Sequence, residues 1–135
     1  MAPVLTISTV IRHVRDMDAA LGLFGTLAAL PYEMIAFAYL DPKRMLLGMR
    51  HTQAGGVDSA EVPVRLVVAD ALAFDAAMVV MAHNHPGGDP APSEADQAAT
   101  RRLARALRSV EVRLVDHLVL AAGGGASSFR AIGLL

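Results

Sequence analysis

The chain has 135 residues, of which 54% are hydrophobic and 19% are charged, and this length fits one domain with its own core. It contains no cysteine, which excludes a disulfide framework, a thiolate metal site and a cysteine nucleophile; the net charge of −1 gives no reason to expect a nucleic acid or an anionic membrane as partner. The chain does not begin with a secretory signal, and the uncharged run over residues 19–32 is too short to span a bilayer, so we expect a cytoplasmic protein.

Hydrophobic periodicity and turn signals predict alternating helices and strands. In chain order we expect a helix at 16–30, a hairpin of strands over 33–49 with its turn at 41–43, a loop at 53–59, a helix at 63–75, a strand at 78–83, a helix at 94–109, a strand at 112–121, a loop at 123–128 and a short final strand. This alternation predicts a layered α/β fold with a mixed sheet, in a single domain over residues 1–135. The apolar excess also points to a homo-oligomer.

The stretch HNHPGGDPAPSEAD over residues 83–96 carries the main functional signal. His83 and His85 end a predicted strand, and side chains two residues apart lie on the same face of a strand. Glycines and prolines then force a tight loop that ends at Ser93, which is typical of a helix N-cap, and Asp96 follows in the first helical turn. Two imidazoles and a carboxylate are a ligand set for catalytic zinc, whose fourth position is left to water.

Simpler interpretations of the same residues remain open. Ser93 and Asp96 alone fit a helix capping arrangement without any metal, and a His-x-His pair alone often marks two surface or core histidines. The strand before the pair, the loop after it and the acid on the next helix together favour metal binding. Two imidazoles favour zinc over magnesium, and zinc would lower the pKa of a bound water towards neutrality.

A hydrolytic zinc site usually needs a carboxylate base nearby, and Glu33 is the best candidate. It begins an otherwise apolar strand, between Tyr32 and Met34, where a charge has little structural purpose. The alternative is that Glu33 only marks the edge of the strand. Weaker candidates in predicted loops are Asp41, Asp58, Glu61 and Asp89.

The spacing of these residues resembles the motif of the JAMM (MPN-plus) metalloproteases. The motif consists of Glu33, His83-x-His85, seven residues, Ser93, two residues and Asp96. The stretch over residues 83–96 more closely resembles the signature of the RadC family, in the same JAB-domain superfamily. Similar stretches occur at 62–65 (VPVR) and 115–117 (VDH), so the resemblance covers residues 30–125.

This resemblance implies a cytidine-deaminase-like α/β sandwich, with a mixed sheet between helices. It implies that zinc is bound by His83, His85 and Asp96. It also implies that Glu33 is the general acid and base on the zinc-bound water, and that Ser93 stabilises the oxyanion formed at a carbonyl. In JAMM enzymes that carbonyl belongs to a peptide or isopeptide bond, so the expected partner is a peptide or protein substrate.

Two departures from the RadC pattern are visible. RadC signatures usually have serine where this chain has Gly87, but this loop position is not a ligand. Full-length RadC proteins also have an N-terminal helix-hairpin-helix region, for which this chain has no room. The historical link of the family to DNA repair therefore gives weak support for a nucleic acid partner.

Other functions fit the residues less well. Deaminase chemistry needs cysteine ligands, and the chain has none. Arg101, Arg105 and Arg108 share a helix face that could contact phosphates, although a solvated face is the simpler interpretation. The glycines at 123–125 lack the lysine of a phosphate-binding loop. The two remaining alternatives to a metallohydrolase are a zinc-containing binding module and a DNA-repair-associated protein without protease activity.

Overall fold

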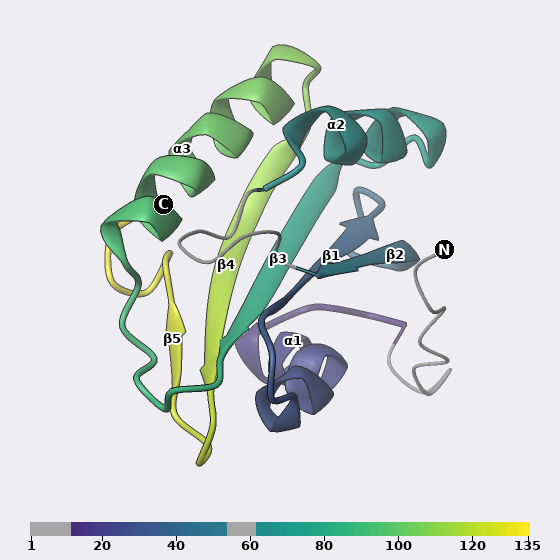
Figure 1. The fold of residues 1–135 in the computed structure, drawn as a ribbon. Coiled ribbons are helices and arrows are strands. Elements are labelled where there is room, and N and C mark those ends of the chain that lie inside the picture. The colour runs from purple at the N-terminus through teal and green to yellow at the C-terminus, as the bar shows by residue number, and fades with distance from the viewer. Residues whose placement is uncertain (1–11, 54–61) are drawn as a thin grey trace.

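A mixed sheet with strand order β2-β1-β3-β4-β5 forms the middle layer of the computed structural model, which describes residues 12–53 and 62–135 (Figure 1). The elements are α1 (Met17–Phe24), the 3-10 helix η1 (Gly25–Ala29), β1 (Met34–Leu40), β2 (Leu46–Gln53), α2 (Val64–Ala73), β3 (Met78–His85), α3 (Glu94–Ser109), β4 (Arg113–Ala121) and β5 (Ala126–Ser128). Strands β3 and β4 are parallel, and the other neighbours are antiparallel. Helix α1 packs on one face of the sheet, and α2 and α3 pack on the other (Figure 1).

Strand β1 is buried along its whole length because it lies between β2 and β3 and is covered on both faces. Ala36 and Ala38 belong to the apolar cluster that includes α1. Phe37 and Tyr39 belong to the cluster under α2 and α3. A continuous apolar run, rather than a strict alternation with polar residues, is the pattern of a strand buried on both sides.

The predicted order of helices and strands and the predicted mixed α/β fold are confirmed. The predicted helix at 16–30 is α1 followed by η1, and it begins at the side-chain cap of Asp16. Strand β2 continues to Gln53, beyond the predicted end at 49, because it stays paired with β1 over this length. Strand β3 extends to His85, so both histidines of the motif lie within it.

The prediction for the C-terminal residues is wrong. Residues 126–128, expected as a loop, form β5, and the residues that follow form turns rather than a strand. Gly123 and Gly124 have φ of +92° and +100°, a backbone conformation that glycine adopts without strain. The chain therefore reverses within a short turn, and β5 pairs with β4 from Ala126 onward.

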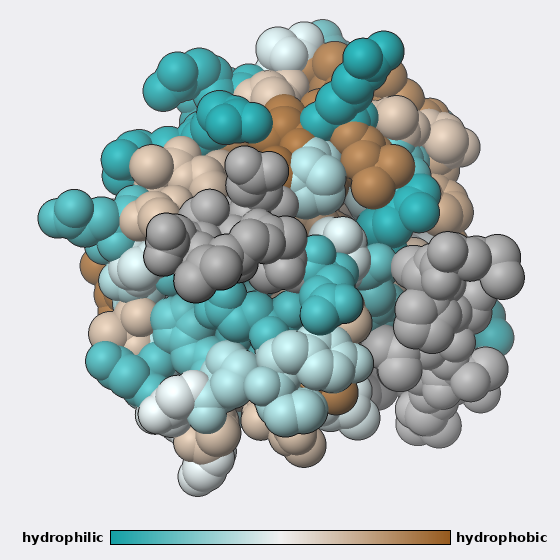
Figure 2. Space-filling model, viewed as in Figure 1, coloured by the Kyte–Doolittle hydropathy of each residue, from teal (hydrophilic) through white to brown (hydrophobic). Residues whose placement is uncertain are grey.

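Several exposed large hydrophobic side chains lie on or just after α2, namely Leu66, Leu72 and Phe74. Figure 2 shows hydrophobic surface in the part of the molecule where α2 lies, above a largely hydrophilic region. The homo-oligomer remains a prediction. No helix within residues 12–53 and 62–135 is long and apolar enough to cross a bilayer.

Asp70 ties α2 to the sheet. The Tyr39 hydroxyl donates a hydrogen bond of 2.8 Å to its Oδ2, and Arg50 donates two more of 2.8 Å from Nε and Nη2. The bonds from Arg50 hold the pKa of the Asp70 carboxyl below its usual value, against the opposing effect of burial. Folding therefore favours the charged form of this carboxyl.

Replacing Asp70 with alanine is expected to lower the free energy of unfolding by about 2–3 kcal/mol at pH 7, because the buried Tyr39 hydroxyl and the Arg50 guanidinium lose a charged acceptor. A lowered pKa in the folded state stabilises the fold above about pH 4, and this contribution is lost as the pH falls through the lowered value. Urea unfolding at pH 7 and at pH 3 measures both effects, with the exposed Arg65→Ala on the same helix as control. An unfolding difference that does not shrink at pH 3 would contradict this account.

Candidate metal centre

Two imidazoles face one another at the C-terminal end of β3. His83 and His85 are two residues apart on this strand and share its α3-facing side, as the sequence predicts. Their Nε2 atoms lie 2.9 Å apart. His83 is buried, and His85 is partly exposed, so the pair lies at the edge of the core.

The loop after β3 determines which nitrogen of His85 carries its proton. His85 Nδ1 lies 2.7 Å from the backbone oxygen of Asp89, an atom that only accepts hydrogen bonds. Nδ1 is therefore the donor, and Nε2 is the nitrogen that faces His83. The loop can fold back in this way because Gly88 has φ of +93° and donates its N–H to the His85 carbonyl.

Three hydrogen bonds in series determine the tautomer of His83. The Thr100 hydroxyl donates to the Asp96 carbonyl at 2.7 Å, so it accepts from His117 Nδ1 at 2.6 Å. Burial holds the pKa of His117 well below its usual value, so this imidazole is neutral and its Nε2 is an acceptor. His83 Nδ1 lies 2.6 Å from that atom and donates to it, which leaves Nε2 as the nitrogen of His83 that faces His85 and Asp96.

Asp96 brings a carboxylate oxygen to the same point. It is buried in the first turn of α3, and its Oδ2 lies 3.4 Å from His83 Nε2 and 3.3 Å from His85 Nε2. Burial raises the pKa of Asp96, but the hydrogen bonds from His83 and Ser93 and the charge of His83 outweigh burial and lower it overall. Because it is held as a carboxylate, Asp96 offers an anionic oxygen next to the Nε2 atoms of two imidazoles.

The donor atoms of His83, His85 and Asp96 fit a zinc ion. The two Nε2 atoms lie 2.9 Å apart, a separation that either a shared proton or a metal ion allows, and the carboxylate adds negative charge to the same point. Atoms bound tetrahedrally at about 2.0–2.1 Å from zinc lie about 3.3–3.4 Å from one another. Two of the three separations have this value. Two imidazoles with one carboxylate are a set that zinc accepts, with one position open.

Glu33 lies beside this set. Its Oε1 is 4.0 Å from His85 Nε2, and its side chain is 39% exposed. One donor atom each from Glu33, His83 and His85 lie within 4.8 Å of one another, so Glu33 is a competing candidate for the third ligand. The Asp96 oxygen is closer to both histidines, is buried and is held by the helix cap, so Asp96 is the better placed of the two candidates.

The structure places Ser93 at the start of α3 as its N-cap. Its Oγ accepts from the Asp96 N–H at 3.0 Å, and Asp96 Oδ2 accepts from the Ser93 N–H at 2.9 Å. The capping box therefore exists, and the same contacts orient the Asp96 carboxylate. Capping and metal binding are compatible functions of this pair, because the capped Asp96 Oδ2 still faces both histidines. The hydroxyl of Ser93 also keeps its own proton to donate.

Two of the weaker candidates, Asp41 and Asp89, have carboxylates that bond to backbone N–H groups outside the site. Asp41 accepts backbone hydrogen bonds in the turn between β1 and β2, and Asp89 accepts one within the loop after β3. Asp58 and Glu61 lie outside the described residues. The arginines at 101, 105 and 108 are exposed on α3.

Sequence reasoning missed two residues behind the ligands, His117 and Thr100. Both are buried polar side chains, on β4 and α3 respectively. His117 belongs to the RadC-like stretch at 115–117, but no role was predicted for it; the other signal was its place in the apolar run of a predicted strand, since a buried polar residue needs a partner.

Replacing His117 with phenylalanine is expected to weaken zinc binding by about 10- to 100-fold, because His83 Nδ1 loses the acceptor that orients it. Phenylalanine should preserve the stacking of this ring on Phe129, whose centroid lies 4.4 Å away. Competition with a chromophoric chelator measures the affinity. Phe129→Leu changes the same ring contact without touching His83 and serves as control. Equal losses in the two variants would assign the effect to packing.

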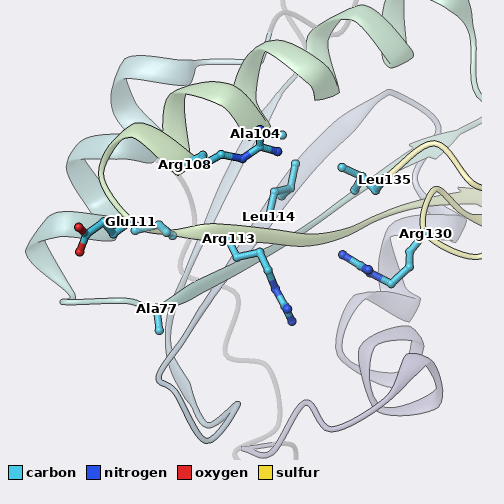
Figure 3. Close-up of a pocket in the computed structure, with 9 residues that line it drawn as sticks. Ala77, Ala104, Arg108, Glu111, Arg113, Leu114, Arg130 and Leu135 are labelled. Carbon is cyan, nitrogen blue, oxygen red and sulfur yellow. The ribbon is translucent and has the colours of Figure 1, made fainter.

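A separate pocket of about 420 Å³ lies near the start of β4, away from the histidines. Arg108, Arg113 and Arg130 are among its lining residues, and Figure 3 shows Arg113 and Arg130 extending into the space beside β4. Because β3 and β4 are parallel, their first residues lie at the end of the sheet opposite to His85. This pocket is therefore not part of the candidate metal centre.

Fold and site together define a mixed α/β sandwich domain with a candidate metal-binding cluster at the end of its central strands. Residues 14–134 match the RadC-like JAB domain, and the chain belongs to this family. The resemblance noted in the sequence is thereby confirmed.

Relatives of the chain are UPF0758 proteins of bacteria. One from Alcanivorax borkumensis is 46% identical over 105 residues, which are 78% of this chain and 47% of that protein. YfjY of Escherichia coli K12 is 43% identical over 132 residues, covering 92% of this chain and 82% of YfjY. One from Vibrio cholerae is 42% identical over 109 residues, covering 81% and 68% respectively. The chain spans about half the length of the Alcanivorax relative.

Proposed function

We propose that this protein is a zinc-dependent hydrolase that cleaves a peptide or isopeptide bond. The observation that carries the proposal is the convergence of His83 Nε2, His85 Nε2 and Asp96 Oδ2 within 3.4 Å of one another, with the Glu33 carboxylate 4.0 Å from His85. A site that only holds metal has no need of an additional, partly exposed carboxylate beside its ligands. That surplus carboxylate favours hydrolysis over passive metal binding.

Each residue has a distinct role in the proposed reaction. His83, His85 and Asp96 hold zinc, which supplies Lewis acidity and lowers the pKa of a water molecule. Glu33 takes a proton from the attacking water and delivers it to the leaving nitrogen. The oxygen of the water bonds to the carbonyl carbon, and the C–N bond breaks. Atoms and charges balance, since one water is consumed for each amine and carboxylic acid formed, and the acid then passes its proton to the amine to give a carboxylate and an ammonium group.

Ser93 is proposed to donate its hydroxyl proton to the carbonyl oxygen of the substrate as negative charge develops there. Its Oγ already accepts from the Asp96 N–H, so its position is set by the start of α3. The donor is therefore oriented before substrate binds. The substrate class is the one that the resemblance to the JAMM motif implies, and the partial exposure of His85 and Glu33 leaves the site open to a peptide segment.

The test is cleavage of a panel of peptides and ubiquitin-like conjugates by the zinc-loaded protein. Protein stripped by a chelator and protein restored with zinc are the matched controls. Zinc-dependent cleavage of at least one class supports the proposal. Retained zinc with binding but no cleavage across the panel would favour a zinc-containing binding module.

A further inference from the structure

Asn84 lies between the two histidines in sequence but points to the other side of the sheet. Side chains alternate along a strand, so His83 and His85 face α3 while Asn84 faces the layer that contains α1. The Asn84 side chain is completely buried. A buried side-chain amide needs hydrogen-bond partners. The partners of Asn84 indicate what this residue does.

All of these partners belong to the segment that carries Glu33. The Met34 N–H donates to Asn84 Oδ1 at 2.7 Å, and Asn84 Nδ2 donates to the Tyr32 carbonyl at 2.8 Å. A third bond of 3.3 Å runs from Nδ2 to the Leu30 carbonyl. The partners require one acceptor and one donor group, which makes the orientation of the amide unambiguous. Asn84 therefore holds the residues immediately before and after Glu33.

These bonds occur where backbone pairing ends. Strands β1 and β3 are paired from Leu40 with Met78 to Ile35 with His83, and no pair continues beyond that point in the described residues. The side chain of Asn84 takes the place of the next rung of the ladder. It thereby connects the backbone around Glu33 to the strand that carries both histidines.

We propose that Asn84 is a positioning residue that holds the Glu33 carboxylate beside the metal ligands; this inference rests on the function proposed above. Asparagine is suited to this position because its short amide offers a donor and an acceptor together. Aspartate keeps the acceptor but has no donor for the two carbonyls, and alanine has neither. In the HNH motif, the two outer residues are thus the proposed metal ligands, and the middle residue positions the proposed base, Glu33.

The test compares Asn84→Ala and Asn84→Ser with wild type, each loaded with zinc. Crystal structures should show the Glu33 carboxylate displaced in Asn84→Ala, while His83, His85 and Asp96 superpose on wild type. Zinc affinity should stay within about threefold, because no ligand is changed. With a substrate in hand, kcat should fall about 100-fold with little change in KM, as expected for a misplaced catalytic group. Asn84→Ser, whose hydroxyl can still donate to one carbonyl or accept from the Met34 N–H, should show a smaller loss and replaces the alanine variant if the latter does not fold.

Two controls separate positioning from general stability. Val80→Ala removes buried side-chain volume from the same face of β3 and should lower stability without lowering kcat. In a Glu33→Gln background, Asn84→Ala should cause no further loss of the residual rate, because its effect operates through Glu33. An unmoved Glu33 in the Asn84→Ala crystal structure would overturn the inference. That structure is informative even if no substrate is cleaved, so failure of the inference and failure of the proposed function are distinguishable.

Discussion

Zinc binding is expected to fall by at least about 100-fold when His83 or His85 is replaced by alanine, more than on loss of a residue behind a ligand. Each substitution removes one of the two nitrogen atoms that face one another at 2.9 Å. The remaining imidazole and the Asp96 carboxylate leave too few donors for a tetrahedral site with one open position. Metal analysis of purified protein and chelator competition measure the stoichiometry and the affinity.

His13→Ala is the control for this experiment, because His13 is exposed and its backbone bridges to Met45, the residue before β2. It should bind one zinc per chain, like wild type. Loss of zinc should also reduce thermal stability, since a ligand bound only to the folded state stabilises it by mass action. If the double variant of His83 and His85 binds as much zinc as wild type, the ligand assignment is wrong.

The parts of the site that could be predicted are those encoded by local patterns. The two-residue spacing of His83 and His85 places them on one strand face, and the spacing of Ser93 and Asp96 is that of a capping box. Both patterns depend on residues close in sequence. The tight loop between them, with Gly88 at positive φ, then brings the start of α3 next to the end of β3.

The parts that could not be predicted depend on pairing between distant segments. His117 reaches His83 only because β4 lies parallel to β3, and Asn84 reaches residues 30–34 only because β1 lies on the other side of β3. No local period encodes these neighbours. Glu33 stands between the two cases. Its charge in an apolar strand was visible in the sequence, but its distance of 4.0 Å from His85 depends on strand order.

Strand β5 shows the same limit on a smaller scale. Its residues are small and polar, with no apolar run to mark a strand. The turn glycines were visible, but their positive φ angles and the immediate return to β4 are properties of the folded sheet. Sequence composition therefore predicted a loop at residues that pair with β4 at the edge of the sheet.

Glu33→Gln is expected to leave zinc bound and to lower the hydrolysis rate by about 100- to 10,000-fold, the contribution of a positioned general base. Glutamine keeps the size and the hydrogen-bonding ability of the side chain but accepts no proton at neutral pH. The experiment distinguishes the roles of the two carboxylates, because Asp96→Asn should release zinc whereas Glu33→Gln should retain it. Hydrolysis rates and bound zinc are measured on the same preparations.

Glu94→Gln is the matched control for the loss of one negative charge, since Glu94 is an exposed carboxylate in the first turn of α3. It should retain both zinc and activity. Loss of zinc in Glu33→Gln would make Glu33 a ligand and would return Asp96 to a capping role alone. Full activity with zinc bound would mean that a group other than Glu33 accepts the proton. Among the described residues, Glu33 is the carboxylate that lies beside the three proposed ligands. Either result would show that Glu33 is not the general base, although its carboxylate lies beside the histidines.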